Sequence, residues 1–235
     1  MDNRITYEWY QKSYSQEGLS AQRRWPNEEL CRFMGRNFFN ISFNERKDIK
    51  ILEAGCGSGA NLKMIVQEGF DTYGLDLSDE AINMVKDILG SRENFHVLAG
   101  DMLSLPYGNN MFDAVVDVFS ANCLTEKQFG LFCEELYRVL KVGGKFFSYT
   151  PSKGSDAWMK KKKEDMLDFS TVNGMNNKEQ PYYGNFYPWR FMDIDDIGRF
   201  FDKEKFVINY TEKVIRTYNK TKTKFEFLVF EVQKI

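Results

Sequence analysis

The sequence lacks the residues that mark several common classes of site. Its 235 residues include one histidine and four cysteines. The cysteines are widely spaced, with no CxxC pair, and stand at Cys31, Cys56, Cys123 and Cys133. This spacing excludes the usual zinc and thiol–disulfide exchange motifs and indicates reduced thiols. We therefore expect no bound metal.

Long apolar runs and a strong charge of one sign are also absent. No stretch approaches the roughly 20 apolar residues needed to span a bilayer. The opening residues, MDNRITYEWYQKSYSQ, contain no continuous apolar core of a secretory signal. The formal net charge is −2, so no long-range attraction to DNA or RNA is expected. These features predict a cytoplasmic protein without a nucleic-acid or membrane partner. The lysine run at 160–163 precedes two acids and is interpreted as a solvated helix face.

What is present is an alternation of short apolar runs and amphipathic stretches. Strands are predicted at residues 49–54, 72–75, 95–99, 112–118 and 145–150. Helices are predicted at residues 27–38, 61–67, 79–89, 129–140 and 193–201. Strands connected by helices of this length favour right-handed crossovers and a parallel sheet covered on both faces. Two β-rich runs, 206–218 and 224–234, flank a polar turn and predict a hairpin.

This order of elements predicts an α/β fold with a doubly wound sheet, mostly parallel, that ends in an antiparallel hairpin. We expect one domain over residues 1–235. Its expected parts are an N-terminal helical lid segment, a ligand-binding core, an insertion rich in polar and aromatic residues, and a final helix with the hairpin. These parts span residues 1–40, 41–150, 151–190 and 191–235.

The strongest functional feature is the glycine-rich turn EAGCGSG at residues 53–59, directly after the first predicted strand. Glycines let the backbone turn sharply and leave room for a ligand against the main chain. The GxGxG spacing differs from the GxGxxG fingerprint of dinucleotide sites. The carboxylate of Glu53 also suits a cationic ligand better than a pyrophosphate. The alternative is a tight turn that binds nothing.

Two further acids follow predicted strands. Asp76 ends the second strand, where a carboxylate can accept hydrogen bonds from both hydroxyls of a ribose. Asp101 ends the third strand, where it can accept from an adenine amino group while Met102 packs on the ring. Taken alone, Asp76 could be a helix cap and Asp101 a plain loop residue. Together with the glycine turn, the three acids favour a nucleoside-like ligand.

Five segments resemble, in order, the successive motifs of class I S-adenosylmethionine (SAM)-dependent methyltransferases of the methyltransferase-11-like kind. They are ILEAGCGSG, YGLDLS, GDMLSLPY, FDAVVDVFSANCL and LYRVLKVGGKFFSYTPS. The resemblance covers about residues 49–151 and implies a Rossmann-like, seven-stranded sheet with an antiparallel last strand. It implies SAM as cofactor and S-adenosylhomocysteine as product. The cofactor contacts it implies are Glu53, Gly55, Cys56, Gly57, Gly59, Asp76, Leu77, Asp101, Met102, Asp117, Val118 and Phe119.

The sequence identifies no single general base. His96 stands early in a predicted buried strand, and we interpret it as structural. Tyr149, Asp117 or a tyrosine of the insertion remain candidates. The chain also departs from many relatives at 120–123, where it has SANC instead of an aromatic or histidine pair.

Two aromatic clusters lie outside the sheet motifs, one within residues 7–25, including Tyr10, and the other within residues 181–191. In related methyltransferases these segments often cover the cofactor and form the acceptor pocket, so the resemblance makes both clusters candidates for a lid. Aromatic walls with polar tips suit flat rings and sugars. Alternatively, the clusters only pack the appendages onto the domain, with the arginines solvated. Either Arg23 or Arg24 could pair with the SAM carboxylate, and Arg24 is the one we select. The candidate acceptor residues are Tyr14, Trp25, Tyr182, Tyr183, Tyr187, Trp189 and Arg190.

The sequence therefore predicts a methyltransferase that uses SAM to methylate an oxygen or nitrogen of a small molecule such as a sugar, a nucleotide-linked sugar or another metabolite. Three alternatives stay open. A non-catalytic SAM-binding protein would keep the same motifs. A nicotinamide-dependent oxidoreductase would show GxGxxG spacing. A macromolecular acceptor is disfavoured by the charge balance and by the absence of an NPPY-type tetrad.

Overall fold

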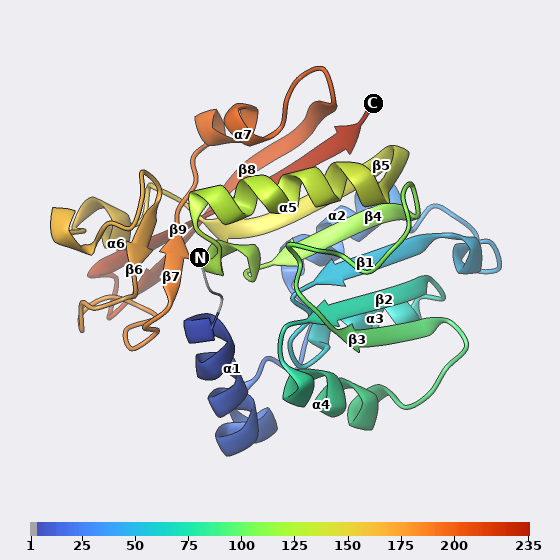
Figure 1. Ribbon diagram of the computed structural model, residues 1–235, viewed down its shortest axis with the longest axis horizontal. Helices are drawn as coiled ribbons and strands as arrows, with labels where there is room; N and C mark the ends of the chain where they lie inside the picture. The colour runs from blue at the N-terminus through green and yellow to red at the C-terminus, as the bar shows by residue number, and fades with distance from the viewer. Residues whose placement is uncertain (1–3) are drawn as a thin grey trace.

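The computed structural model describes residues 4–235 and is built on a seven-stranded sheet in the order β3-β2-β1-β4-β5-β9-β8 (Figure 1). The strands β1 to β5 run parallel, and β9 is antiparallel to both β5 and β8. The predicted doubly wound sheet and its C-terminal hairpin are confirmed. The strand bounds are β1 Lys50–Ala54, β2 Asp71–Asp76, β3 Phe95–Ala99, β4 Phe112–Val118, β5 Leu140–Pro151, β8 Phe206–Tyr218 and β9 Thr223–Lys234.

Helices cover both faces of the sheet. One face carries α5 (Glu126–Val139) and α7 (Ile194–Phe200), and the other carries α2 (Glu28–Asn37), α3 (Ala60–Gln67) and α4 (Asp79–Leu89) (Figure 1). Each face has its own buried apolar cluster, as expected for parallel strands that are buried on both sides. Four helices begin at a side chain that accepts hydrogen bonds from the first backbone N–H groups. These caps are Asn27, Ser78, Thr125 and Asp193.

The N-terminal segment was expected to be a helical lid, but the sequence predicted a helix only at residues 27–38 and none at the position of α1 (Arg4–Glu17). Its inward side consists of aromatic residues such as Tyr10 and Tyr14 rather than aliphatic ones, so no clear apolar period marks it. A short 3₁₀ turn, Gly18–Ala21, ends this segment before α2. The predicted residues 1–3 of the lid segment lie outside the described part of the chain.

The boundary between α5 and β5 also differs from the prediction. The helix begins at Glu126 because Thr125 and Gln128 form a reciprocal capping box at its start. The strand begins at Leu140, five residues before the predicted start at residue 145. Its pairing with β4 shifts between Phe112 and Ala114, and Gly143 has a φ of 80°, so the extra residues form an irregularity in the strand.

The insertion after β5 contains short elements only. They are α6 (Asp156–Met159), a 3₁₀ turn (Lys163–Asp165), and an antiparallel pair of β6 (Thr171–Asn173) with β7 (Pro188–Arg190). The prediction that the lysine run forms a helix face is wrong, because α6 ends at Met159 and residues 160–162 belong to a loop. This module and α1 lie on the side of the sheet where the parallel strands end (Figure 1).

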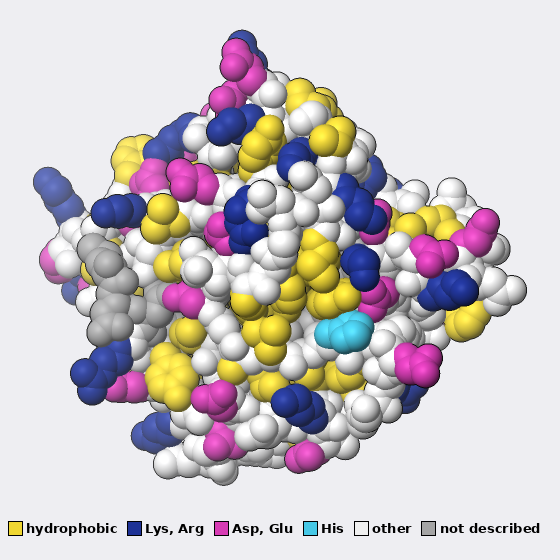
Figure 2. Space-filling model, turned by 45° about the vertical axis from the view of Figure 1, so that its right-hand side comes forward, with side chains coloured by type: hydrophobic (Ala, Val, Ile, Leu, Met, Phe, Trp, Pro, Cys, Tyr) yellow, Lys and Arg dark blue, Asp and Glu magenta, His cyan; other side chains and the backbone are white. Residues whose placement is uncertain are grey.

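No helix in residues 4–235 is both long enough and apolar enough to cross a membrane. Basic and acidic side chains are interspersed over the face of the molecule that carries the histidine (Figure 2). On that face no region of a single charge stands out, in keeping with the small net charge of the chain.

Candidate active site

A cavity of ≈ 520 Å³ lies at the carboxyl ends of β1 to β4. The strand order reverses between β1 and β4, which is where ligands bind in doubly wound sheets. The glycine turn, α1 and the segment before β7 complete its walls. The predicted residues that line it are Tyr14, Glu53, Gly55, Cys56, Gly57, Asp76, Leu77, Asp101, Met102, Val118, Phe119, Tyr182 and Tyr187.

The glycine turn is held by β2 and leaves its own backbone open to the cavity. The N–H groups of Gly55 and Cys56 both donate to the carbonyl of Leu75, at 2.7 and 3.0 Å. Gly55 has a φ of 75°, and a Cβ there would lie 1.6 Å from Oγ of Ser120. Only glycine fits this close approach. Gly59, in contrast, faces Val85 of α4 and does not line the cavity, so its role is packing.

Glu53 is a buried acid with one oxygen atom left unpaired. Its side chain is 1% exposed, and Oε1 accepts a hydrogen bond from Nδ2 of Asn61 at 2.5 Å. No hydrogen-bond partner for Oε2 exists among the described residues. Burial raises the pKa of Glu53 to about 8, against the lowering effect of the Asn61 bond. A cation placed beside Oε2 would satisfy this oxygen and stabilise the ionised carboxylate.

Asp76 connects the end of β2 to the glycine turn. Its Oδ2 accepts from the N–H of Gly57 at 2.8 Å, and Oδ1 accepts from the N–H of Ser78 at 3.0 Å. Burial raises the pKa of this carboxyl, and the backbone hydrogen bonds lower it. Each oxygen retains a second lone pair that can accept from a ligand hydroxyl. Asp101, at the end of β3, accepts from the N–H of Leu103 at 2.9 Å and lies beside Met102 on the cavity wall.

The turn after β4 brings Phe119 and Ser120 to the cavity and keeps Asp117 out of it. Asp117 is fully buried, and its carboxylate accepts from the N–H groups of Ser120 and Ala121 and from Oγ of Ser148, at 2.8 to 3.1 Å. These bonds hold the turn in which Phe119 has a φ of 63°, an uncommon value for a non-glycine residue. The geometry therefore gives Asp117 a positioning role.

Tyr149, the other candidate base, points into the aromatic core. Its ring stacks on Phe227 with centroids 4.6 Å apart, and 4% of the residue is exposed. Burial raises its pKa above the ordinary value, which is the wrong direction for a base at neutral pH. The described residues that line the cavity include neither Tyr149 nor Asp117.

Part of the cavity wall is made of tyrosines from two distant segments. The hydroxyl of Tyr10 on α1 lies 3.0 Å from the hydroxyl of Tyr187 and 3.7 Å from Sγ of Cys123. Tyr14 approaches the glycine turn, since its hydroxyl would lie 2.9 Å from a Cβ placed on Gly57. Tyr182 packs against Phe119 with centroids 5.2 Å apart. Both aromatic clusters thus reach the same cavity.

Other predicted acceptor and cofactor residues lie elsewhere. Trp189 is completely buried beneath Tyr187 and Phe119. Arg190 is also buried: its guanidinium lies 3.6 Å from the ring centroid of Phe129 and donates to the carbonyl of Ala121. Burial lowers the pKa of this arginine to about 10. The remaining predicted residues that lie outside the lining are Arg24, Trp25 and Tyr183, all of them exposed.

Several cavity residues were missed or left undecided by the sequence. Arg23 lines the cavity where Arg24 was selected, because the sequence alone could not distinguish two adjacent arginines in a loop. Tyr10 was seen only as part of an aromatic cluster, since α1 was not predicted. Ser120 and Cys123 belong to the SANC segment that departs from the usual family pattern.

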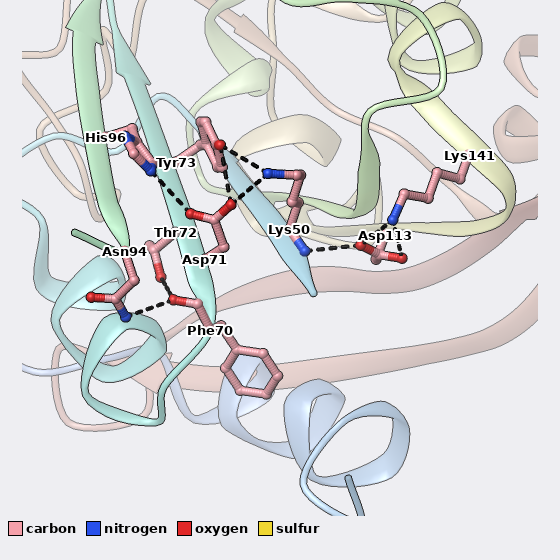
Figure 3. A network of polar contacts seen from close by, with 9 residues as sticks. All are labelled: Lys50, Phe70, Asp71, Thr72, Tyr73, Asn94, His96, Asp113 and Lys141. Atoms are coloured by element: carbon pink, nitrogen blue, oxygen red, sulfur yellow. Dashed lines mark hydrogen bonds and ion pairs between the residues drawn. The ribbon is translucent and has the colours of Figure 1, made fainter. Parts of the chain in front are cut away.

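His96 belongs to a polar network at the opposite, amino end of the strands (Figure 3). Its Nε2 lies 3.0 Å from Oδ1 of Asp71, and its ring stacks on Tyr73 with centroids 4.6 Å apart. Lys50 donates to the same carboxylate. The prediction of a structural histidine agrees with this network, but the side chain is 45% exposed because β3 is the edge strand.

The fold and the cavity define an α/β protein whose site fits a small nucleoside with a cationic group. Three observations support the fit to SAM: the unpaired oxygen of Glu53, the glycine cradle that a Cβ would fill, and the carboxylate of Asp76 at the adjacent strand end. Groups of three or more metal-ligating side chains are absent from residues 4–235.

Comparisons with known proteins agree with this class. Residues 52–148 match the family model described as "Methyltransferase domain". Over 139 residues the chain is 28% identical to cycloartenol-C-24-methyltransferase 1 of Oryza sativa subsp. japonica, covering 57% of this chain and 40% of that protein. Over 102 residues it is 32% identical to a demethylmenaquinone methyltransferase of Staphylococcus aureus, covering 42% of each. The chain thus spans about two fifths of the length of these relatives.

The fold extends beyond the matched segment. A SAM-dependent methyltransferase from Methanosarcina mazei has the same fold, with a TM-score of 0.66 at 18% identity, covering 79% of this chain and 92% of that one. Residues 52–148 are thus similar to a methyltransferase domain, and the chain has the fold of a SAM-dependent methyltransferase.

Proposed function

We propose that the protein transfers a methyl group from SAM to an oxygen or nitrogen atom of a small molecule. The observation that carries the proposal is the unpaired, buried oxygen of Glu53 beside the glycine turn, within a methyltransferase domain. A buried carboxylate requires a partner, and an ammonium group is the simplest one. A pyrophosphate next to the same oxygen would be repelled, which argues against the nicotinamide alternative.

The cofactor half of the cavity would be formed by the strand ends. Glu53 would bind the amino group of SAM, Asp76 the ribose hydroxyls, and Asp101 with Met102 the adenine. Arg23, which lines the cavity where Arg24 does not, would pair with the carboxylate of the ligand. SAM, when bound, supplies a methyl group on a positively charged sulfur that is already activated for displacement. The chain must therefore mainly bind and orient the two reactants.

On the proposed acceptor side, the described tyrosines and Cys123 offer hydroxyl groups and a thiol. Burial raises the pKa of Tyr10, Tyr14 and Tyr187 well above the ordinary value, and that of Cys123 to about 12. These groups stay protonated near neutral pH, so they orient an acceptor by hydrogen bonds and do not deprotonate it. A neutral amine or an acidic hydroxyl on a flat molecule fits such a wall better than a sugar hydroxyl, which requires a base.

The size of the site supports a small acceptor. A cavity of ≈ 520 Å³ falls in the range of about 300–1,000 Å³ typical of small-molecule sites. Two of the relatives carry names that refer to small molecules, cycloartenol and demethylmenaquinone. The formal net charge of −2 gives no general attraction for a nucleic-acid acceptor.

Two measurements test this proposal. Mass spectrometry of the purified, denatured protein should detect retained SAM or S-adenosylhomocysteine, and calorimetry should give saturable binding of both. Incubation with methyl-labelled SAM and pooled metabolite extracts should then transfer the label to a small molecule. Well-folded protein without affinity for either compound would exclude the proposal. Binding without turnover on any pool would favour the non-catalytic alternative.

A further inference from the structure

A second cavity, of ≈ 270 Å³, lies within the insertion and plays no part in the proposed methyl transfer. It is formed by the loop after α6 and by the segment from β6 to residue 180. Its rim carries three lysines of the run at 160–163, and these lysines face one aspartate, Asp165. The cavity therefore has a net positive charge when all four side chains are ionised.

The lysines have little to neutralise them. Nζ of Lys161 donates to the carbonyl of Trp158 at 3.2 Å and lies 3.8 Å from the centroid of the Trp158 ring. Burial and the positive charge of Lys153 lower its pKa. Lys162 is 3.9 Å from a carboxylate oxygen of Glu164, with both side chains largely exposed, so this pair is weak. An anion in the cavity would be attracted by the positive charge of these lysines.

Gln180 provides independent evidence for a ligand. This residue is among those that line the cavity and is 5% exposed. Neither Nε2 nor Oε1 of its amide has a hydrogen-bond partner among the described residues. A buried amide left without partners is destabilising, so a bound group that both accepts and donates hydrogen bonds would satisfy it. A phosphate that carries one proton does both.

Apolar side chains form the floor of the cavity. Val172 and Met175 are buried there at 5% and 4% exposure. A site with a basic rim, a buried amide and an apolar floor suits a charged head attached to an organic body. Lysines act on phosphate as point charges without demanding a planar, two-pronged partner, which favours a phosphate over a carboxylate.

We propose that this second cavity binds a phosphate group, either free or carried by a small organic molecule. The lysines of the rim supply the charge, and Gln180 supplies the directional hydrogen bonds. The site lies next to the first cavity: the N–H of Met175 donates to the carbonyl of Asn185 at 2.9 Å, and Asn185 lines the larger cavity. Binding is independent of methyl transfer, so this proposal can fail or hold separately from the proposed function.

The test is a titration of the full chain with inorganic phosphate and with phenyl phosphate, at constant low ionic strength, by calorimetry. Saturable binding is expected for the wild type. The triple variant K160Q/K161Q/K162Q should weaken it at least about tenfold, because three cations are removed. Gln180→Leu should weaken it about threefold or more, because two hydrogen bonds are lost. Lys178→Gln is the matched control: an exposed lysine of the same segment outside the cavity.

Unchanged binding by Lys178→Gln together with the expected losses supports the site. Tighter binding of phenyl phosphate than of inorganic phosphate assigns it to organic phosphates, and equal binding assigns it to the free ion. The proposal is overturned if the wild type shows no saturable binding of either probe, or if the triple variant binds as the wild type does. Melting temperatures of all variants show that each is folded.

Discussion

At the residue scale, the chemistry of the site depends most on Glu53. Burial alone would make this acid a poor ligand, because it raises the pKa to about 8 and leaves the carboxyl mostly protonated at neutral pH. The unpaired Oε2 changes this when a cation arrives, since the attraction favours the ionised form. Ligand binding and ionisation of Glu53 are therefore coupled.

This coupling predicts that SAM affinity depends on pH. At pH 6 the free protein holds a proton on Glu53 that must leave when the cation binds, so affinity should rise with pH. The increase should be at most about tenfold per pH unit and should level off above pH 8, where the free carboxyl is already ionised. Calorimetric titrations between pH 6 and pH 9 measure this slope.

The Glu53→Gln variant separates the pH dependence of affinity that this acid causes from the pH dependence caused by ionisable groups of SAM. The variant should bind SAM more weakly and lose the part of the slope that Glu53 causes. Glu93→Gln, at an exposed position outside the cavity, should keep the wild-type profile. A Glu53→Gln protein with the wild-type slope would show that this carboxyl does not meet the cation.

The hydroxyl of Tyr187 gives a second prediction at this scale. Tyr187→Phe removes its bond to Tyr10, at a cost of about 1 kcal/mol in the free energy of unfolding. Turnover should fall while the dissociation constant of SAM stays within about twofold, because the lost hydroxyl lies on the acceptor side. Steady-state kinetics and calorimetry measure the two effects. A drop in SAM affinity as large as the drop in turnover would contradict this division of the cavity.

At the scale of elements, the sequence predicted those helices, strands and turns that a regular apolar period or a glycine-rich segment determines. Ile51 and Leu52 lie in a continuous apolar run, and Ser78 caps a clear amphipathic helix, so β1 and α4 were both predicted. Helix α1 was missed because its inward face consists of tyrosines. In a sequence these can equally well be surface residues, so they give no clear apolar period. Trp189 was assigned to the acceptor site because its burial depends on tertiary contacts that no local pattern encodes.

The glycine turn can be tested as an element. Gly55→Ala places a Cβ against Ser120 and forces a left-handed φ on a residue with a side chain. SAM affinity should fall by more than about tenfold, since the left-handed conformation alone costs about 1–2 kcal/mol before the steric clash is counted. Adding Ser120→Gly should recover part of the loss by removing the clash. Thermal unfolding and calorimetry measure both effects.

Gly130→Ala is the matched control for this substitution. Gly130 lies inside α5, where a Cβ would meet nothing within 4 Å. Alanine should therefore stabilise the helix by up to about 1 kcal/mol and leave SAM binding unchanged. Equal loss of affinity in both variants would mean that the turn has no special part in the site.

At the scale of the whole molecule, the cavity joins three parts of the chain that are far apart in sequence. Oγ of Ser78, at the start of α4, donates a hydrogen bond to Oε1 of Gln11 on α1 at 2.6 Å. Oγ of Ser58 donates to the carbonyl of Arg23 at 3.1 Å. Tyr187 connects the insertion to α1 through Tyr10. A ligand in the cavity contacts all three parts, so it should stabilise them together.

Hydrogen exchange tests this cooperation. With saturating S-adenosylhomocysteine, amide exchange should slow in α1 (Arg4–Glu17), in the glycine turn and in residues 182–187, because opening any of these walls would release the ligand. The hairpin turn at 219–223 serves as the internal control, since it does not line the cavity, and its exchange should not change. Protection confined to the glycine turn would mean that α1 and the insertion do not close over the bound cofactor, and the acceptor wall would then have to form from other segments.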